Sequence, residues 1–327
     1  MTGDGPGSGS RSTDGKPGTL MARLDRPTAP ERVRLAVIAD PHVSTRAEGT
    51  SKLFEHSLDH FEAAIDDIAR RDVDAVLSPG DLTKDGEVWN ADAVADALDA
   101  LDVPVYAVPG NHDVPKDGDD HDAISVDTFA DRFGPGTYPF HEKVGGLDVL
   151  GLNSAGSGDH LVDTHDGHVD ADQREWLAGK LQRTDDPLIV VHHNLTAVTD
   201  QLRRHRDRVV EDMAIPPTMR EIDPFVDVLA NGDAALVLTG HFHLPLTGVD
   251  RGVREIATPT TCSFPQSYLL VNITPRGTDV RLVPIADQDG LELAHDRRAR
   301  DSTTARGLTS IGAARLASMP LAVEDRP

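Results

Sequence analysis

Five short apolar stretches of this 327-residue chain each end in side chains that can bind metal ions or transfer protons. A lone Gly-Asp pair is usually a turn and a lone histidine usually a surface or core group, but five such endings together predict one site. Imidazole, carboxylate and amide ligands suit Mn, Fe or Zn ions. In chain order the endings are Asp40-x-His42, Gly80-Asp81, Gly110-Asn111-His112-Asp113, His192-His193 and Gly240-His241-x-His243.

These ligand types favour phosphoryl chemistry. Two divalent ions ~3.5–4 Å apart need a carboxylate that bridges them, and together they hold both ends of an in-line phosphoryl displacement. A hydroxide shared by two cations is a ready nucleophile at neutral pH, because each cation lowers the pKa of the bound water.

The elements that must position these side chains are strands. Apolar runs of strand length occupy residues 33–39, 73–77, 103–108, 188–191 and 234–238, and helical apolar spacing lies between the first three runs. Alternating strands and helices imply a largely parallel sheet, and sites in such sheets gather at the carboxyl ends of the strands.

The blocks DPH, GDLTKDG, GNHD, HH and GHFH resemble the five-block signature of calcineurin-like binuclear metallophosphoesterases, in the family's order and over about residues 33–285. The wording is most similar to the branch of class III cyclic-nucleotide phosphodiesterases, as is the segment 167–181. The resemblance implies an α/β fold, namely a four-layer α/β/β/α sandwich of two mixed sheets with the metal centre at the carboxyl ends of strands. It also implies a phosphoester hydrolase whose nucleophile is a hydroxide that bridges two transition-metal ions (Mn, Fe or Zn).

The resemblance also implies a role for each residue of the blocks. His112 would stabilise the developing charge or protonate the leaving oxygen, and Asp113 would hold the His112 imidazole in its cationic form. His193 is expected to support a ligand rather than bind metal. The implied ligands are Asp40, His42 and His243 for the first ion, Asn111, His192 and His241 for the second, and Asp81 bridging both.

Two positions depart from the family pattern, one arguing against the purple acid phosphatase subgroup and the other concerning the shape of a loop. Lys84 stands where purple acid phosphatases have a tyrosine, and Asn194 replaces a proline that many relatives have after the histidine doublet. A small-molecule phosphodiesterase acting on cyclic nucleotide-like substrates is the first expectation. A nucleotide-diphosphate or phosphomonoester hydrolase, a nuclease and a non-enzymatic scaffold of the same fold stay open as alternatives.

The charge balance excludes some partners. Asp+Glu number 55 against 32 Lys+Arg, a formal net charge of −23, which argues against nucleic acid and anionic lipid as partners. The composition resembles that of salt-adapted archaeal proteins, with an ordinary acidic protein as the alternative. No apolar run approaches ~18 residues, so no membrane span is expected and a cytoplasmic location is predicted. The sole cysteine, Cys262, is expected to be a packed thiol.

The chain is expected to hold one domain between two tails. Residues 1–30 are rich in Gly, Ser, Thr and Pro and predict a disordered tail without a secretory signal, and Met21 is an alternative start. Residues 31–294 would form the metallophosphoesterase domain, and the arginine-rich, aperiodic residues 295–327 a loose tail. The sequence does not determine the oligomeric state.

Overall fold

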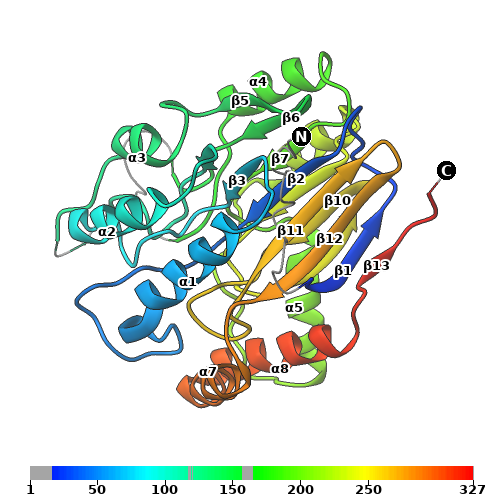
Figure 1. Ribbon diagram of the computed structural model, residues 1–327. Coiled ribbons are helices and arrows are strands. Elements are labelled where there is room, and N and C mark those ends of the chain that lie inside the picture. Colours follow the sequence, from blue (N-terminus) through cyan, green and yellow to red (C-terminus); the bar gives the residue numbers. More distant parts are fainter. Residues whose placement is uncertain (1–16, 117–118, 120, 157–164, 327) are drawn as a thin grey trace, which may run out of the picture.

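Two β-sheets packed face to face form the centre of the molecule, and helices cover their outer faces (Figure 1). The computed structural model describes residues 17–116, 119, 121–156 and 165–326. This arrangement confirms the four-layer α/β/β/α architecture that the sequence predicts. Among the described residues, no helix is both long and apolar enough to cross a membrane.

The first sheet has seven strands in the order β13-β1-β12-β11-β2-β3-β4. Strands β2, β3 and β4 are parallel, whereas β11 pairs antiparallel with β2 and β12. The strand bounds are β1 (Thr19–Leu24), β2 (Val33–Val37), β3 (Ala75–Ser78), β4 (Val105–Ala107), β11 (Ser267–Thr274), β12 (Gly277–Pro284) and β13 (Ala322–Val323).

The second sheet has six strands in the order β5-β6-β7-β8-β10-β9, with β6, β7, β8 and β10 parallel. Strands β7 and β8, which precede ligand-bearing loops, therefore lie in the middle of this sheet and are buried along their whole length. The bounds are β5 (Phe140–Val144), β6 (Leu147–Gly151), β7 (Leu188–Val190), β8 (Leu236–Thr239), β9 (Leu246–Asp250) and β10 (Val253–Ala257).

Apolar side chains on both faces of the central strands hold the layers together. Leu35 and Val37 of β2 point into the core between the sheets, while Ala36 points to the helices outside. Successive side chains of a strand alternate between its faces, so a strand buried on both faces reads as the continuous apolar run seen in the sequence.

Helices on the two outer faces complete the layers. On the first sheet lie α1 (Ser57–Ala69), α2 (Val88–Leu98) and α3 (Val126–Phe133), with the 3₁₀ helix η1 (Phe54–His56) before α1. The second sheet is covered by α4 (Ala171–Leu181) and α6 (Ile222–Asn231), and α5 (Thr196–Arg208) packs on β9. The last helices are α7 (Gln288–Asp301) and α8 (Thr303–Ala317).

The prediction of a disordered tail over residues 1–30 is wrong for its second half. Strand β1 pairs antiparallel with β12, and Figure 1 shows it beside β12 and β13. Met21, Ala22 and Leu24 are fully buried in the core between the sheets. The run is only six residues long between Gly- and Pro-rich stretches, and its partner strand lies more than 250 residues away in the chain. Residues 1–16 of the expected tail lie outside the described residues.

The loose C-terminal tail expected over residues 295–327 is also wrong, because α7, α8 and β13 occupy most of it. The buried face of α8 includes two glycines: a Cβ on Gly307 would lie 2.4 Å from Met213 Sδ, and one on Gly312 would lie 3.0 Å from Leu244 Cδ2. Close packing through glycine and alanine leaves little apolar periodicity in the sequence, which explains why these helices read as aperiodic.

Candidate metal centre

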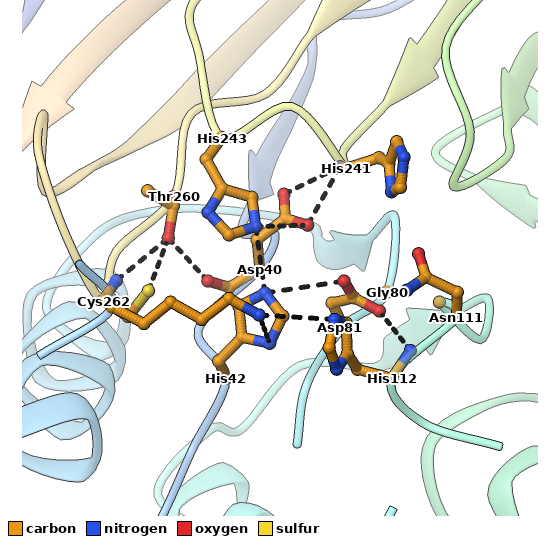
Figure 2. Close-up of polar contacts among 12 residues, drawn as sticks. Asp40, His42, Gly80, Asp81, Asn111, His112, His241, His243, Thr260 and Cys262 are labelled. Carbon is orange, nitrogen blue, oxygen red and sulfur yellow. Dashed lines mark hydrogen bonds and ion pairs between the residues drawn. The ribbon is translucent and has the colours of Figure 1, made fainter. Parts of the chain in front are cut away.

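The seven expected ligands come together where strands of both sheets end. Figure 2 labels all of them except His192. Asp40 and His42 follow β2, Asp81 follows β3, Asn111 follows β4, His192 follows β7, and His241 and His243 follow β8. His112 lies among them and faces Asp81 through its backbone amide, which donates to Asp81 Oδ1 at 2.8 Å.

One group of potential ligand atoms belongs to Asp40, His42, Asp81 and His243. One ligand atom from each of the four lies within 4.8 Å of all the others. His42 Nε2 and His243 Nε2 are 2.9 Å apart, and His243 Nε2 is 3.5 Å from Asp40 Oδ1. Lone pairs that converge this closely need a cation or a proton between them, so these residues fit a metal ion.

A second group gathers around His192. Its Nε2 lies 3.0 Å from Asn111 Oδ1 and 3.2 Å from His241 Nδ1. The other nitrogen of each ring is already engaged, since His192 Nδ1 donates to Pro79 O at 2.7 Å and His241 Nε2 donates to Pro217 O at 2.7 Å. Such outer hydrogen bonds fix the tautomer that leaves a lone pair on the nitrogen facing the site.

Asp81 connects the two groups. Its Oδ2 atom lies 3.5 Å from His42 Nε2 and 3.5 Å from His192 Nε2. Burial alone would raise the pKa of Asp81, but His192, His112 and Lys52 hold that pKa well below its usual range, so the side chain is a carboxylate. The position of this oxygen is the one that a bridging ligand requires.

The imidazoles of both groups are neutral and therefore able to bind metal. Burial lowers the pKa of His192 and lowers the pKa values of His42, His241 and His243 well below the ordinary histidine value. Burial and the neighbouring Asp81 raise the pKa of Asp40 well above its usual range, because two carboxylates without a cation repel each other. Two buried carboxylates among neutral imidazoles are the donor set of a site for transition-metal cations.

The backbone of the ligand loops is strained at the ligands themselves. Asp40, His42, Asp81, His241 and His243 all have positive φ, between 43° and 69°. Left-handed conformations at non-glycine residues cost of order 1–3 kcal/mol each and persist where the surroundings impose them. These strained conformations lower the stability of the fold, and they direct the five side chains toward the same site.

Two glycines allow the loops after β3 and β4 to approach each other. A Cβ on Gly80 would lie 2.4 Å from Gly110 N, and a Cβ on Gly110 would lie 2.1 Å from Asp81 Oδ1. Gly80 also has φ of 97°. The glycines of the GD and GN blocks are therefore required by the close packing of the loops around Asp81.

The carboxylate that holds His112 is Asp85 and not Asp113, which corrects the expected pairing. Asp85 Oδ1 lies 2.7 Å from His112 Nδ1, so the Nε2 atom of His112 faces the site. Burial would raise the pKa of Asp85, but the bond to His112 and the charges of His112, Lys84 and Lys116 hold it well below its usual range. Asp85 belongs to the GDLTKDG block, so its place in that motif was a usable signal.

Asp113 instead ties two ligand loops together. Its carboxyl group accepts hydrogen bonds from the backbone amides of Gly110, Leu82 and Thr83 and from Thr83 Oγ1, at 2.9 to 3.1 Å. Burial and the neighbouring Asp81 raise the pKa of Asp113 to about 7. Asp113 therefore holds the loops after β3 and β4 together. Among the described hydrogen bonds and ion pairs, it has no contact with the His112 ring.

Two further side chains that the sequence did not single out reach the site. Lys52 Nζ lies 3.2 Å from His42 Nδ1 and 3.3 Å from His112 Nε2. His165 Nδ1 accepts from Asn111 Nδ2 at 2.6 Å, which turns Asn111 Oδ1 toward His192. Burial and His112 lower the pKa of His165 to about 4, so its ring is a neutral acceptor. Neither residue belongs to a recognisable motif, and His165 lies in a loop that reads as a solvated acidic segment.

His193 lies beside His192 and His241 of the second group. Its Nδ1 lies 2.9 Å from Ser154 Oγ and its Nε2 donates to His165 O at 3.0 Å. Its ligand atoms also fall within 4.8 Å of His192 and His241, but both its nitrogens have these protein partners. Burial and His192 lower the pKa of His193 to about 3.

Asn194, which replaces the proline of many relatives, is held by a buried carboxylate. Asn194 Nδ2 donates to Glu255 Oε1 at 3.0 Å and to Thr239 Oγ1 at 2.7 Å. Glu255 also accepts from Thr239 Oγ1 and from the Leu195 backbone amide. This network ties the loop after β7, which carries His192, to β8 and β10.

Replacing Glu255 with glutamine is expected to lower the free energy of unfolding by about 1–3 kcal/mol, because an amide NH₂ would face donors that are then left unpaired. Burial raises the pKa of Glu255 to about 7 in the folded state. Its protonated form therefore adds stability below the unfolded pKa, and this contribution is lost as pH rises through about 7. The difference in the free energy of unfolding between wild type and Glu255→Gln should shrink from pH 5 to pH 8. It would be measured by denaturant unfolding of protein from which a chelator has removed metal ions.

The exposed Glu62 of α1 supplies the matched control, Glu62→Gln, which should change stability little at any of these pH values. A stability difference for Glu255→Gln that stays constant or widens as pH rises would contradict the raised pKa.

Helix α7 fastens the loop that carries His243. The Arg298 side chain is 3% exposed, and its guanidinium donates to His243 O at 3.2 Å, to Phe264 O and to Phe242 O. The Thr260 hydroxyl donates to Asp40 O at 2.6 Å and contacts Cys262 Sγ (Figure 2). Cys262 is buried, as expected of a packed thiol.

The sequence is similar to those of curated proteins named as cyclic nucleotide phosphodiesterases. A probable cyclic nucleotide phosphodiesterase of Rhodococcus erythropolis is 26% identical over 208 residues, 58% of this chain and 58% of that protein. The 3',5'-cyclic adenosine monophosphate phosphodiesterase CpdA of Vibrio vulnificus is 24% identical over 236 residues, 70% of this chain and 77% of that protein.

Among solved structures, a dimetal phosphatase from Danio rerio shares the fold with a TM-score of 0.61 at 16% identity. The match covers 78% of this chain and 97% of that one. The family model for the calcineurin-like phosphoesterases matches residues 33–245, a range that contains all seven residues of the two ligand groups. The chain therefore belongs to the calcineurin-like phosphoesterase family.

Proposed function

We propose that this protein hydrolyses phosphoesters at a binuclear metal centre. The observation that carries the proposal is the position of Asp81 Oδ2, which lies 3.5 Å from a ring nitrogen of each ligand group. A carboxylate oxygen between two sets of neutral imidazoles is the arrangement that two neighbouring cations need.

Each group of residues would hold one ion. Asp40, His42 and His243 would bind the first, and Asn111, His192 and His241 the second, with Asp81 shared. The donor set fits Mn, Fe or Zn. Such ions supply an activated water as nucleophile and positive charge for the phosphoryl oxygens.

Residues of the chain would donate a proton to the leaving group and orient the metal ligands around the phosphate. Asp85 holds His112 through Nδ1, so a protonated Nε2 can donate to the oxygen of the leaving group as the P–O bond breaks. His165 and Pro217 O orient Asn111 and His241 and leave the centre free for the phosphoryl group.

The substrate class proposed first is a small phosphodiester of the cyclic nucleotide type. Its support is that the two curated relatives described above bear names of cyclic nucleotide phosphodiesterases. A nucleotide-diphosphate or phosphomonoester hydrolase is the second candidate, since the same centre suits both. A net charge of −23 disfavours a nuclease, and a complete set of ligands disfavours a scaffold.

The test is a substrate panel with metal-loaded protein. Purified chain reconstituted separately with Mn, Fe and Zn would be assayed against 3',5'-cyclic AMP, bis-p-nitrophenyl phosphate, nucleoside diphosphates and p-nitrophenyl phosphate. Metal-dependent turnover of the diesters with little turnover of the monoesters is the expected result. Faster turnover of monoesters or diphosphates would favour the second candidate, and no turnover by fully loaded protein would contradict the proposal.

The charge excess predicts a response to salt, consistent with a salt-adapted protein. Repulsion among −23 formal charges acts over a Debye length of roughly 30 Å at 0.01 M salt but only about 3 Å at 1 M. Anionic substrates meet the same repulsive field. The melting temperature and kcat/KM should therefore both rise from low to molar KCl with saturating metal. If both stay flat or fall, the acidic surface has no such role.

A further inference from the structure

Lys52 brings a cation into the candidate metal centre without being one of its ligands. Its Nζ atom lies 3.2 Å from His42 Nδ1 and 3.3 Å from His112 Nε2. Burial lowers the pKa of Lys52, and the negative charges of Asp81, Asp85 and Asp40 oppose this lowering. The lysine comes from the segment between β2 and η1, outside the blocks that carry the metal ligands.

The segment that carries Lys52 is built to hold it in place. Thr50 and Leu53 have left-handed backbones, with φ of 62° and 52°. The turn is closed by the Phe54 amide, which donates to Gly49 O at 3.2 Å, and by the Lys52 amide, which donates to Thr50 Oγ1 at 3.1 Å. Leu53 and Phe54, next to Lys52 in the chain, are buried and anchor the segment. A strained turn with two apolar anchors fixes the direction of the lysine, as sites of function often do.

Metal binding would remove one acceptor of the Lys52 ammonium, the Nδ1 atom of His42. A His42 ring that gives the Nε2 lone pair to a metal ion keeps a proton on Nδ1 and cannot accept a hydrogen bond there. Lys52 must then find another acceptor close to His112, because its backbone is held in place.

The position of His112 indicates where this acceptor would lie. With Nδ1 engaged by Asp85, the Nε2 edge of the His112 ring faces the site, 3.3 Å from Lys52 Nζ. A phosphoryl oxygen that reaches this edge of His112 therefore also comes within reach of the Lys52 ammonium, and hydrogen bonds from a cation to an anionic oxygen are among the strong ones. We propose that Lys52 is a further catalytic residue, whose ammonium binds a non-bridging oxygen of the substrate phosphoryl group beside His112. This inference rests on the proposed phosphoester chemistry and adds a phosphate-binding cation to it.

The test measures phosphate binding apart from turnover. Inorganic phosphate would be titrated calorimetrically into metal-loaded wild type, Lys52→Met, Lys52→Arg and the control Lys143→Met, which removes an exposed lysine of β5. Lys52→Met should keep the metal content of wild type and bind phosphate about 10- to 100-fold more weakly, the size of one charge-assisted hydrogen bond. Lys52→Arg should recover part of the affinity, and Lys143→Met should match wild type.

Two results would overturn the role of Lys52. One is wild-type phosphate affinity in fully loaded Lys52→Met. The other is loss of metal from both Lys52 variants, which would make the lysine structural. Failure of the proposed function looks different: wild type would bind phosphate through Lys52 and hydrolyse none of the phosphoesters. Steady-state kinetics with bis-p-nitrophenyl phosphate add that Lys52→Met should lose kcat/KM by at least the factor lost in phosphate affinity.

Discussion

Replacing Asp81 with alanine is expected to remove both metal ions from the protein and to lower turnover by more than about 10³-fold. The reason is that Oδ2 of this one carboxylate lies 3.5 Å from a ring nitrogen of each ligand group. Losing a single well-placed electrostatic group in an active site already costs ~10²–10³-fold, and here the cations themselves would be lost. Elemental analysis and kcat with bis-p-nitrophenyl phosphate are the measurements.

Asn111→Ala is the matched comparison for this variant. Asn111 Oδ1 contacts only the second group, at 3.0 Å from His192 Nε2 among the described contacts. This variant should keep the first ion and lose affinity mainly for the second. An Asp81→Ala protein that still holds two ions per chain would contradict the shared position of Asp81.

The second large effect is expected at His112. His112→Ala should keep both ions and lose about 10²–10⁴-fold in kcat, the usual size of a general acid contribution. The loss should be smaller for p-nitrophenolate than for an alkoxide leaving group, because a good leaving group needs less help from a proton. Equal losses for both would leave His112 with electrostatic support alone, and loss of metal would contradict its place outside the ligand set.

Asp85→Asn and Asp113→Asn separate the carboxylate that positions His112 from the carboxylate that braces the loops. Asp85 contacts His112 Nδ1 at 2.7 Å, so its variant should lose about 10–100-fold in kcat and shift the pH profile of turnover. Within the described part of the chain, Asp113 accepts hydrogen bonds only from the loop amides and Thr83 Oγ1. Its variant should therefore lower stability and leave the pH profile in place. The reverse pattern would restore the pairing expected from the sequence.

Much of this architecture could be predicted from sequence because it depends on local rules. The runs at 33–39 and 234–238 could be recognised as strands because buried parallel strands read as continuous apolar runs. The residues that follow them could be recognised as ligands because sites gather at the carboxyl ends of such strands. Each ligand group takes residues from loops of both sheets, and the position of Asp81 between the two groups was implied by the family resemblance. The order and identity of the blocks then led to the correct family.

The parts that the sequence did not predict depend on pairings between distant segments or on small residues. Strand β1 pairs with β12 across the whole chain, and α8 packs through Gly307 and Gly312, which carry no apolar pattern. Arg298, more than 50 residues after His243, reaches its carbonyl only because α7 folds back over the ligand loop. The roles of Glu255 and Lys52 were not predicted for the same reason. A buried charged residue can be assigned a role only once the groups around it in the fold are known.

Anomalous X-ray diffraction from crystals of Mn-loaded wild-type protein tests the central claim most directly. The account predicts two Mn peaks per chain about 3.5–4 Å apart, with Asp81 Oδ2 between them. One peak should lie among Asp40, His42 and His243, and the other among Asn111, His192 and His241. A single peak, or two peaks that do not share Asp81, would contradict it.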